Sequence, residues 1–420
     1  MLYERWIAVA RERRDQLAVR DIVSGEDWTF GRLFDAAASR VVSGPIAMPQ
    51  GSDVVFVLDV IAAWKAGLVL CPLEVGQSRP SVLDDSQKFP PGTVHLKMTS
   101  ATSGPAKCVA FTAEQLAADC DQIIGTMGLR PECPNIAVLS LAHSYGFSNL
   151  ILPLLLSGIP LVLGGSPLPQ NVLRAASGFD AVTLPAVPAL WRVWLEADAI
   201  PRNVKLAISA GAPLPLPLEA AVHEQCGVKI HNFIGASECG GIAYDASSKP
   251  RTDAAWAGTA MKGVGFSIDD DGCLVVKSAA AATAYWPAGD AKLGDGCFVT
   301  SDLAELRDDG LWLRGRAGDV INVAGRKVSP EEIERVLQTH PDVVECLVVG
   351  LPAAEGDSRG EQVGAVVVTR NAATREVLRQ HLVDRLPGWQ VPKEWLFVES
   401  LSPNQRGKLS RAEWRRRWNG

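Results

Sequence analysis

Short apolar runs alternate with segments of helical periodicity through the first half of the chain, and this alternation restricts the fold more than any other feature. Apolar residues recur at helical spacing in 27–42 and 53–67, and the apolar run LVLCPL follows the second segment. The segment AEQLAADCDQIIGTM is also helical in pattern, with Thr112 and Gln115 placed as a capping box. The runs IAVLSLA, LVLGG, AVTLPA and VKLAISA then continue the series of short strands. Such alternation predicts an α/β fold, with mainly parallel sheets in a large N-terminal domain.

The pattern changes after about residue 255. The stretches FSIDDDGCLVVKS and AELRDDGLWLRGR each place an Asp-Gly pair between two apolar runs, which is typical of a β-hairpin. Residues 255–316 are therefore predicted to form a β-rich subdomain within an N-terminal domain that spans residues 1–316.

A compact α+β unit is expected next. Ser329 is placed as a helix N-cap, Pro330 stands at the first helical position, and Glu332 can complete a capping box. The strand-like runs ECLVVG and GAVVVT and the helical segment REVLRQHLVDRL follow. We predict a small α+β C-terminal domain at residues 319–420.

Composition and charge exclude several classes of protein. The chain has 420 residues, 47% of them hydrophobic and 21% charged, which suits a globular protein of at least two domains. A formal net charge of −6 argues against unspecific attraction to nucleic acid. Nine scattered cysteines without a CxxC pair favour buried, reduced thiols over a zinc site or a disulfide framework. The apolar run 150–163 is broken by Pro153, Gly158 and Pro160 and is shorter than the ~18–20 residues of a membrane span, so it is predicted to be core. The charged N-terminus lacks the apolar core of a signal peptide, and a cytoplasmic protein is expected.

A loop rich in hydroxyl groups follows the strand-like stretch VHLKM. Its side chains suit phosphate, because hydroxyls donate to the oxygens, a glycine lets the backbone approach, and a lysine adds positive charge. The candidate phosphate-binding residues are Thr99, Ser100, Thr102, Ser103, Gly104 and Lys107. The loop is not a Walker A motif, since Ala106 and Cys108 flank the lysine. Taken alone, such a turn is more often a plain surface loop.

This loop resembles the pyrophosphate-binding loop TSGSTG-x-PKG of the adenylate-forming superfamily, which comprises acyl- and aryl-CoA synthetases, peptide-synthetase adenylation domains and luciferases. Residues 209–213 (SAGAP) are similar to the family's SGGAP turn, whose backbone lines the adenine, and residues 232–238 (NFIGASE) are similar to N-x-YG-x-TE. The resemblance assigns Ser237 to phosphate and Glu238 to magnesium, a cation that prefers hard oxygen ligands. It assigns to the nucleotide Gly211, Ala212, Pro213, Asn232, Phe233 and Ile234, the last in place of the usual aromatic residue.

Three further segments of the family appear in the expected order. Thr300-Ser301-Asp302 is similar to TGD, and GRAGD with GRKVSPEEIE is similar to the signature GR-x-x-D-x-I-x-x-x-G-x-x-V-x-P-x-EIE. The resemblance implies that Asp302 and Arg316 bind the ribose and that Asp319 is the hinge of a mobile C-terminal lid domain. PNQRGKLSR resembles the terminal segment P-x-x-x-x-GK-x-x-R. Its lysine, Lys408, would stabilise charge between the two anionic substrates as pyrophosphate departs.

The segment LAHSYGFS lies where the family places a wall of the acyl pocket. By resemblance this wall includes His143, Tyr145, Gly146 and Phe147, with Gly235 nearby. The alternative for His143, a hydrogen-bonded core histidine, is the less favoured of the two. No aspartate corresponds to the one that binds the ammonium of amino-acid substrates, so a fatty or aromatic acid is expected, because an unpaired buried ammonium is costly.

The resemblance implies an AMP-forming acid–thiol ligase. It would use ATP and Mg2+ to form an acyl-adenylate and pass the acyl group to coenzyme A, with Lys408, Glu238, Thr102 and His143 as catalytic residues. Two alternatives to this activity stay open: the phosphopantetheine thiol of an acyl carrier protein as acceptor, and a non-catalytic ligand-binding protein of the same fold. Assembly as a homodimer is left open as well. The basic, aromatic tail RAEWRRRWNG could attract an anionic thiol partner, although a solvated helix end is the plainer interpretation.

Overall fold

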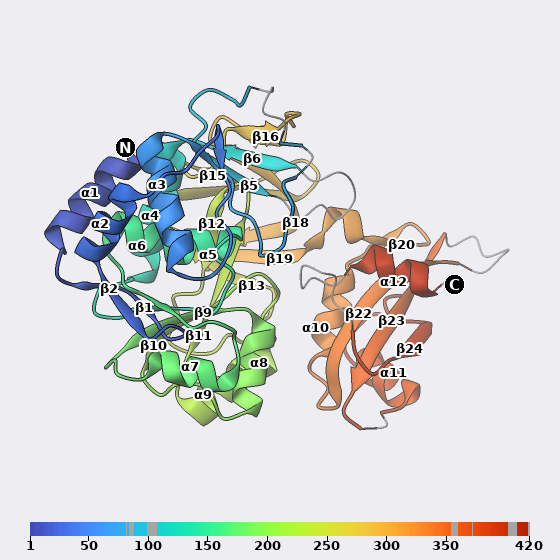
Figure 1. Cartoon of the computed structure of the whole chain (residues 1–420). Helices are drawn as coiled ribbons and strands as arrows, with labels where there is room; N and C mark the ends of the chain where they lie inside the picture. Colours follow the sequence, from blue (N-terminus) through green and yellow to red (C-terminus); the bar gives the residue numbers. More distant parts are fainter. Residues whose placement is uncertain are drawn as a thin grey trace.

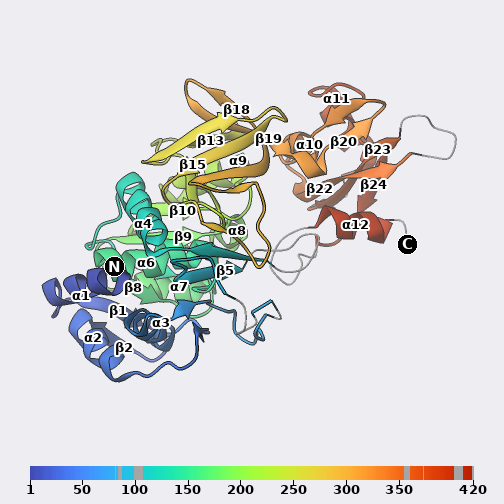
Figure 2. The same ribbon diagram turned by 90° about the horizontal axis from the view of Figure 1, so that it is seen from above.

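The computed structural model describes residues 1–80, 82–83, 88–98, 107–353, 360–371, 373–401 and 410–418. A large body contains the described residues up to strand β19, and a smaller body lies beside it, next to the end of that strand (Figures 1 and 2). Among the described residues no helix has both the length and the apolar character needed to cross a membrane. All nine cysteines are free thiols, and most of them are buried.

The first half of a long sheet is parallel, as the alternation of strands and helices predicts. Its neighbours run in the order β11, β10, β9, β7, β8, β1, all paired in parallel, and β2 closes the edge in the antiparallel sense. The strands are β1 (Leu17–Asp21), β2 (Glu26–Thr29), β7 (Asn135–Ala137), β8 (Leu161–Leu163), β9 (Val182–Ala186), β10 (Val204–Ser209) and β11 (Ile230–Ala236).

Helices cover both faces of this parallel sheet, because alternate side chains of a strand point to opposite sides. In β8, Val162 packs in the core beneath α7, α8 and α9, whereas Leu161 and Leu163 belong to the core beneath α1, α2, α3, α4 and α6. Figure 1 shows these two groups of helices on opposite sides of the strands. The helices are α1 (Leu2–Glu12), α2 (Phe30–Ser39), α3 (Val54–Ala66), α4 (Ala113–Met127), α5 (Ser144–Gly146), the π-helical turn η1 (Phe147–Ile151), α6 (Leu152–Ser157), α7 (Pro169–Ala176), α8 (Pro188–Glu196) and α9 (Leu216–Cys226).

The second half of the long sheet is antiparallel, and its strands after β12 lie within residues 255–316. The order continues β12, β13, β19, β18, β15, β14, with β17 paired to β18. Both predicted hairpins are confirmed, as β14–β15 and β18–β19. These strands are β12 (Gly240–Tyr244), β13 (Trp256–Ala260), β14 (Val264–Ile268), β15 (Cys273–Ser278), β17 (Leu293–Gly294), β18 (Cys297–Arg307) and β19 (Gly310–Arg316).

A second, smaller sheet carries the two strands that flank the predicted phosphate loop. Its order is β16, β6, β5, β4, β3, and Met98 of β5 pairs with Cys108 of β6. The strands are β3 (Ile46–Ala47), β4 (Val69–Leu70), β5 (His95–Met98), β6 (Cys108–Phe111) and β16 (Ala284–Trp286). The two ends of the loop are therefore held next to each other.

The C-terminal body is a three-stranded sheet with helices on both faces, and the predicted fold class is confirmed. Val348 of β22 packs with α10 and α11 in one core, whereas its neighbours Leu347 and Val349 pack with α12 on the other face. The elements after β19 are the 3-10 turn η2 (Ala317–Asp319), β20 (Ile321–Val323), β21 (Arg326–Val328), α10 (Pro330–Leu337), β22 (Val343–Pro352), β23 (Glu361–Thr369), α11 (Arg375–Val383), β24 (Glu394–Phe397) and α12 (Arg411–Trp418).

Local signals set most helix boundaries, with two exceptions. The capping box of α4 forms, since the backbone N–H of Thr112 donates to Gln115 at 2.8 Å. The helix expected from residue 27 begins only at Phe30, because β2 occupies Glu26–Thr29. The capping box expected at Ser329 is wrong: its hydroxyl donates to the Glu331 carboxylate at 3.1 Å instead.

Candidate active site

The predicted adenine-binding turn lies at the carboxyl ends of the parallel strands, where ligands of open α/β sheets bind. Ser209, the last residue of β10, pairs with Ala186 at the end of β9 and with Asn232 of β11. Gly211 follows in the left-handed region at φ = 84°, a conformation that glycine adopts without strain. Gly211, Ala212 and Pro213 are all exposed, so the backbone of this turn is open to a ligand.

The predicted nucleotide-binding strand β11 buries some of its candidate residues and exposes others. Asn232 and Phe233 are buried, Ile234 is half-buried and Gly235 is exposed. The ring of Phe233 lies 5.8 Å from the ring of Tyr145, which comes from the predicted acyl wall. The segment predicted to bind the nucleotide and the segment predicted to line the acyl pocket therefore pack against each other.

The residues assigned to phosphate and magnesium lie at the turn after β11. The hydroxyl of Ser144 donates to the Ser237 hydroxyl at 2.9 Å, which joins this turn to the start of α5. Glu238 accepts a hydrogen bond of 2.9 Å from the hydroxyl of Tyr285 in β16, and Lys107 Nζ lies 5.3 Å from the centre of the same ring. Burial and the adjacent Glu238 carboxylate raise the pKa of Tyr285, so the phenol stays protonated and donates to Glu238.

The predicted ribose-binding pair forms across the β18–β19 hairpin. Asp302 and Arg316 are paired in register, and Arg316 Nε donates to Asp302 Oδ1 at 3.1 Å. The Thr300 hydroxyl accepts a hydrogen bond of 3.0 Å from the Asp302 N–H and so helps to hold the backbone at Asp302. The carboxylate remains half-exposed and can accept further hydrogen bonds.

The predicted acyl wall divides into an exposed part and a buried part. His143 is exposed, with Nε2 3.3 Å from the Glu74 carboxylate. Phe147 is fully buried in the core, with its ring 4.5 Å from that of His95. Gly146 is also buried, and a Cβ at that position would lie 1.9 Å from the carbonyl oxygen of Ser140, so this helix approaches the preceding turn closely enough to require glycine. His143 is therefore the most exposed of these four wall residues, Tyr145 is half-buried, and the other two are buried.

A buried polar cluster beneath the site was not found from the sequence. Lys97 Nζ lies 3.6 Å from Asp119 Oδ2 and donates to the Ser148 hydroxyl at 3.1 Å, which in turn donates to Asp119 at 2.6 Å. Asp119 also accepts from the N–H of Gly241 at 3.2 Å, just after the turn that carries Glu238. This cluster joins β5, α4, η1 and β12 and thereby fixes the Glu238 turn. The sequence signal was a lysine in the apolar stretch VHLKM.

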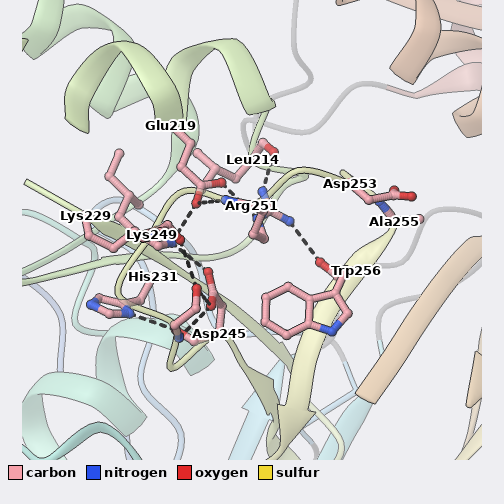
Figure 3. Close-up of polar contacts among 12 residues, drawn as sticks. Leu214, Glu219, Lys229, His231, Asp245, Lys249, Arg251, Asp253, Ala255 and Trp256 are labelled. Atoms are coloured by element: carbon pink, nitrogen blue, oxygen red, sulfur yellow. Dashed lines mark hydrogen bonds and ion pairs between the residues drawn. The ribbon is translucent and has the colours of Figure 1, made fainter. Parts of the chain in front are cut away.

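A second buried cluster supports the predicted adenine-binding turn (Figure 3). Lys229 Nζ lies 2.6 Å from both Glu219 and Asp245, and Arg251 Nε donates to Glu219 at 2.9 Å. Arg251 also donates from Nη2 to the carbonyl of Leu214 at 2.7 Å, immediately after the turn. Two acids and two bases balance in charge, so this cluster connects α9, β11 and the turn without a net buried charge.

Some predicted residues lie outside the part of the chain that the structure describes. These are Thr99, Ser100, Thr102, Ser103, Gly104 and Lys408. Lys107, at the described end of the predicted phosphate loop, has its Nζ 3.9 Å from Asp290 Oδ2. Asp319, the predicted hinge, is the last residue of η2, and its carboxylate forms an ion pair with Arg411.

The donor set fits a magnesium–nucleotide complex. Glu238 supplies a half-exposed hard oxygen ligand, and Mg2+ usually completes its shell with substrate phosphates and water. Ser237, Lys107 and the Asp302–Arg316 pair add hydrogen-bond and charge partners suited to phosphate and ribose.

Known proteins resemble the chain along most of its length. The family model described as AMP-binding enzyme matches residues 89–286, and the model described as AMP-binding enzyme C-terminal domain matches residues 332–408. The sulfoacetate–CoA ligase of Cupriavidus necator is 28% identical over 363 residues, which cover 79% of this chain and 69% of that protein. The 2-succinylbenzoate–CoA ligase of Bacillus cereus is 27% identical over 334 residues, covering 76% and 68%. The crystal structure of ATP-bound MatB from Rhodopseudomonas palustris has a TM-score of 0.87 at 20% identity and covers 100% of this chain and 99% of that one, which shows a common fold.

These matches and the shared fold define an AMP-forming acid–thiol ligase that uses ATP and Mg2+. The chain belongs to the adenylate-forming superfamily, as its sequence motifs predict.

Proposed function

We propose that this enzyme activates a fatty or aromatic carboxylic acid as an acyl-adenylate and transfers the acyl group to coenzyme A. One contact carries the proposal: the 2.9 Å hydrogen bond between Ser144 and Ser237. Ser144 belongs to the segment assigned to the acid, and Ser237 to the segment assigned to the ATP phosphates. These two assignments come from motifs 93 residues apart, yet the side chains touch, as a reaction between acid and nucleotide requires.

The first half-reaction joins the acid to the nucleotide. A carboxylate oxygen attacks the α-phosphorus of ATP while the bond from that phosphorus to the bridging oxygen of pyrophosphate breaks, and pyrophosphate leaves with the electron pair. Two anions must meet, so the protein must mainly orient them and neutralise charge. Glu238 would hold Mg2+, which neutralises charge on the phosphate oxygens when bound, while Ser237 and Lys107 would contact the phosphates. We assign to Lys408 the stabilisation of charge between the carboxylate and the α-phosphate.

The second half-reaction transfers the acyl group. The thiol sulfur attacks the acyl carbon, the bond to the AMP oxygen breaks, AMP leaves with the electron pair, and the thiol proton passes to solvent. The C-terminal domain would turn about the segment near Asp319 between the two half-reactions. We expect the reaction to take place in the cytoplasm, where ATP and coenzyme A are both supplied.

ATP–pyrophosphate exchange tests the first half-reaction and reveals the acid. The panel should contain fatty acids, aromatic acids, sulfoacetate and 2-succinylbenzoate, because the relatives named above act on acids of quite different size. Glu238→Gln should lower exchange by at least ~10-fold and raise the Mg2+ concentration for half-maximal rate, since one hard ligand is lost. Glu224→Gln, an exposed carboxylate on α9, is the matched control. ATP binding without exchange for any acid would favour the non-catalytic alternative.

The phosphopantetheine arm of an acyl carrier protein is the second candidate acceptor. The exposed Arg416 and Arg417 of α12 favour it, because acidic carrier proteins are attracted to basic surfaces. Thioester formation measured with each acceptor separates the two. Faster transfer to coenzyme A, with little change in Arg416→Ala, supports our assignment, and faster transfer to a carrier protein overturns it.

A further inference from the structure

Arg411, the first residue of α12, makes five polar contacts around one guanidinium group. Nη1 lies 2.8 Å from Asp319 Oδ2 and 3.0 Å from Glu331 Oε1. Nη2 lies 2.8 Å and 2.9 Å from the two carboxylate oxygens of Glu334, and Nε donates to the carbonyl of Val348 at 3.1 Å. A single side chain thus connects η2, α10, β22 and α12.

Burial makes this arrangement selective for arginine. The Arg411 side chain is 18% exposed, and those of Glu331 and Glu334 are 19% and 14% exposed. Burial raises the pKa of Glu334, whereas the charge of Arg411 acts in the opposite direction. Arginine can contact several carboxylates at once through its planar fork, and a lysine ammonium cannot reproduce that geometry.

The contact with Asp319 decides to which domain the predicted hinge residue belongs. Its carboxylate is held by a residue of the C-terminal domain, 92 positions along the chain. Ala317 and Gly318, just before it, are both exposed, and a Cβ built on Gly318 would meet nothing within 4 Å. Gly315 instead lies against the start of α10, where a Cβ would come 2.4 Å from the Ser329 hydroxyl. The unanchored stretch is therefore 317–318, between Arg316, which is held by Asp302, and the Asp319 carboxylate.

We propose that Arg411 is a positioning residue that fixes the Asp319 carboxylate to the body of the C-terminal domain, so that the domain turns together with Asp319 about residues 317–318. This inference rests on the proposed function, in which the C-terminal domain takes up a defined orientation for adenylate formation. Arg411 also stands three residues after Lys408 in the sequence, a separation that a chain can span by at most ~11 Å. A loose Arg411 would therefore loosen the point from which the catalytic lysine extends.

Arg411→Met tests the proposal, with Arg416→Met as the matched control on the exposed face of the same helix. The kcat of adenylate formation should fall by ~10–100-fold, because a small misplacement of a catalytic group is that costly. The dissociation constant for ATP should change less than ~2-fold, because Glu238, Asp302 and the adenine-binding turn lie in the N-terminal domain. A nucleotide affinity that falls as much as kcat, or a kcat equal to that of the control, would overturn the proposal.

Asp319→Asn keeps the proposal testable if Arg411→Met unfolds the small domain. Only one of the three carboxylates loses its charge, so the fold should persist, and kcat should fall in the same way with ATP affinity retained. The double variant should be no slower than Arg411→Met, because both changes break one connection. A double variant whose loss of kcat equalled the combined losses of the two single variants would contradict the proposal.

Hydrogen exchange separates this inference from the proposed function, because it requires no reaction. Peptides covering 316–320 should exchange faster in Arg411→Met than in the control, while β22 and β23 remain protected. Unchanged hydrogen exchange at 316–320 would overturn the positioning role of Arg411, even in an active enzyme. If the wild-type enzyme formed no adenylate but the variant exchanged faster, the role of Arg411 would be supported and only the proposed function would be refuted.

Discussion

Replacing Lys229 by methionine should strongly destabilise the N-terminal domain. The side chains of Glu219 and Asp245 are 0% exposed, and each has an oxygen 2.6 Å from Lys229 Nζ. Methionine fills a similar volume but leaves one negative charge more than positive in the buried cluster. Within the described part of the chain, the donors left to the Asp245 carboxylate are the neutral N–H and hydroxyl of Ser247, whereas Glu219 keeps Arg251.

The magnitude follows from burial. Removing one partner of a buried ion pair costs ~3–5 kcal/mol, and the upper half of that range applies because both carboxylates are fully buried. Urea unfolding followed by tryptophan fluorescence measures the loss, with Lys249→Met, a change at an exposed lysine of the same region, as control at ~0.5 kcal/mol or less. Adding Asp245→Asn should recover part of the loss, since it removes the unpaired charge. If Lys229→Met unfolded at the same urea concentration as the control, the cluster would not stabilise the domain as argued.

Three further predictions concern the surroundings of the site. Gly146→Ala should abolish adenylate formation and lower the melting temperature, because the added Cβ would overlap a backbone carbonyl. The control Gly289→Ala, which has open space around the Cβ, should change neither. Equal melting temperatures of the two variants would contradict the packing at Gly146. Burial and then the nearby lysine lower the pKa of His95 well below 6.5, so the folded state keeps it neutral while the unfolded state gains a proton below that pH. Wild-type stability should therefore fall by ~1.4 kcal/mol per pH unit below pH 6.5 relative to His95→Gln, and parallel stability curves from pH 7.5 to 5.5 would refute this. Tyr285→Phe removes the hydrogen bond to Glu238. The Mg2+ concentration for half-maximal adenylation should rise several-fold, while the melting temperature stays unchanged. An unchanged Mg2+ dependence would show that the phenol does not orient this carboxylate.

The sequence predicted the features that depend on local pattern. The hairpins at the Asp-Gly pairs and the capping box of Thr112 and Gln115 formed because neighbouring residues determine them. The helix expected from residue 27 failed because β2 pairs with β1, a contact that apolar spacing does not encode. No capping box forms at Ser329, because its hydroxyl donates to the Glu331 carboxylate instead.

The candidate site was predictable where a motif carried it and not where tertiary packing did. Motif order singled out Ser237 and Glu238, on the turn after β11, and Asp302, within β18. The partner of Glu238, Tyr285, comes from a strand of the other sheet, and the buried pair Lys97 and Asp119 meets only after β5 and α4 pack together. Contacts of this kind depend on which elements become neighbours, information that a single sequence holds only indirectly.

The most direct test of the account is ATP–pyrophosphate exchange in the Lys408→Ala variant with the best acid of the panel. Lys393→Ala, an exposed lysine in the same domain, is the control. The account predicts a loss of ~100-fold or more in exchange with ATP binding retained, because a charge that acts mainly in the transition state is removed. Exchange at the rate of the control variant would contradict the claim that this chain joins an acid to a nucleotide with a lysine supplied by its C-terminal domain.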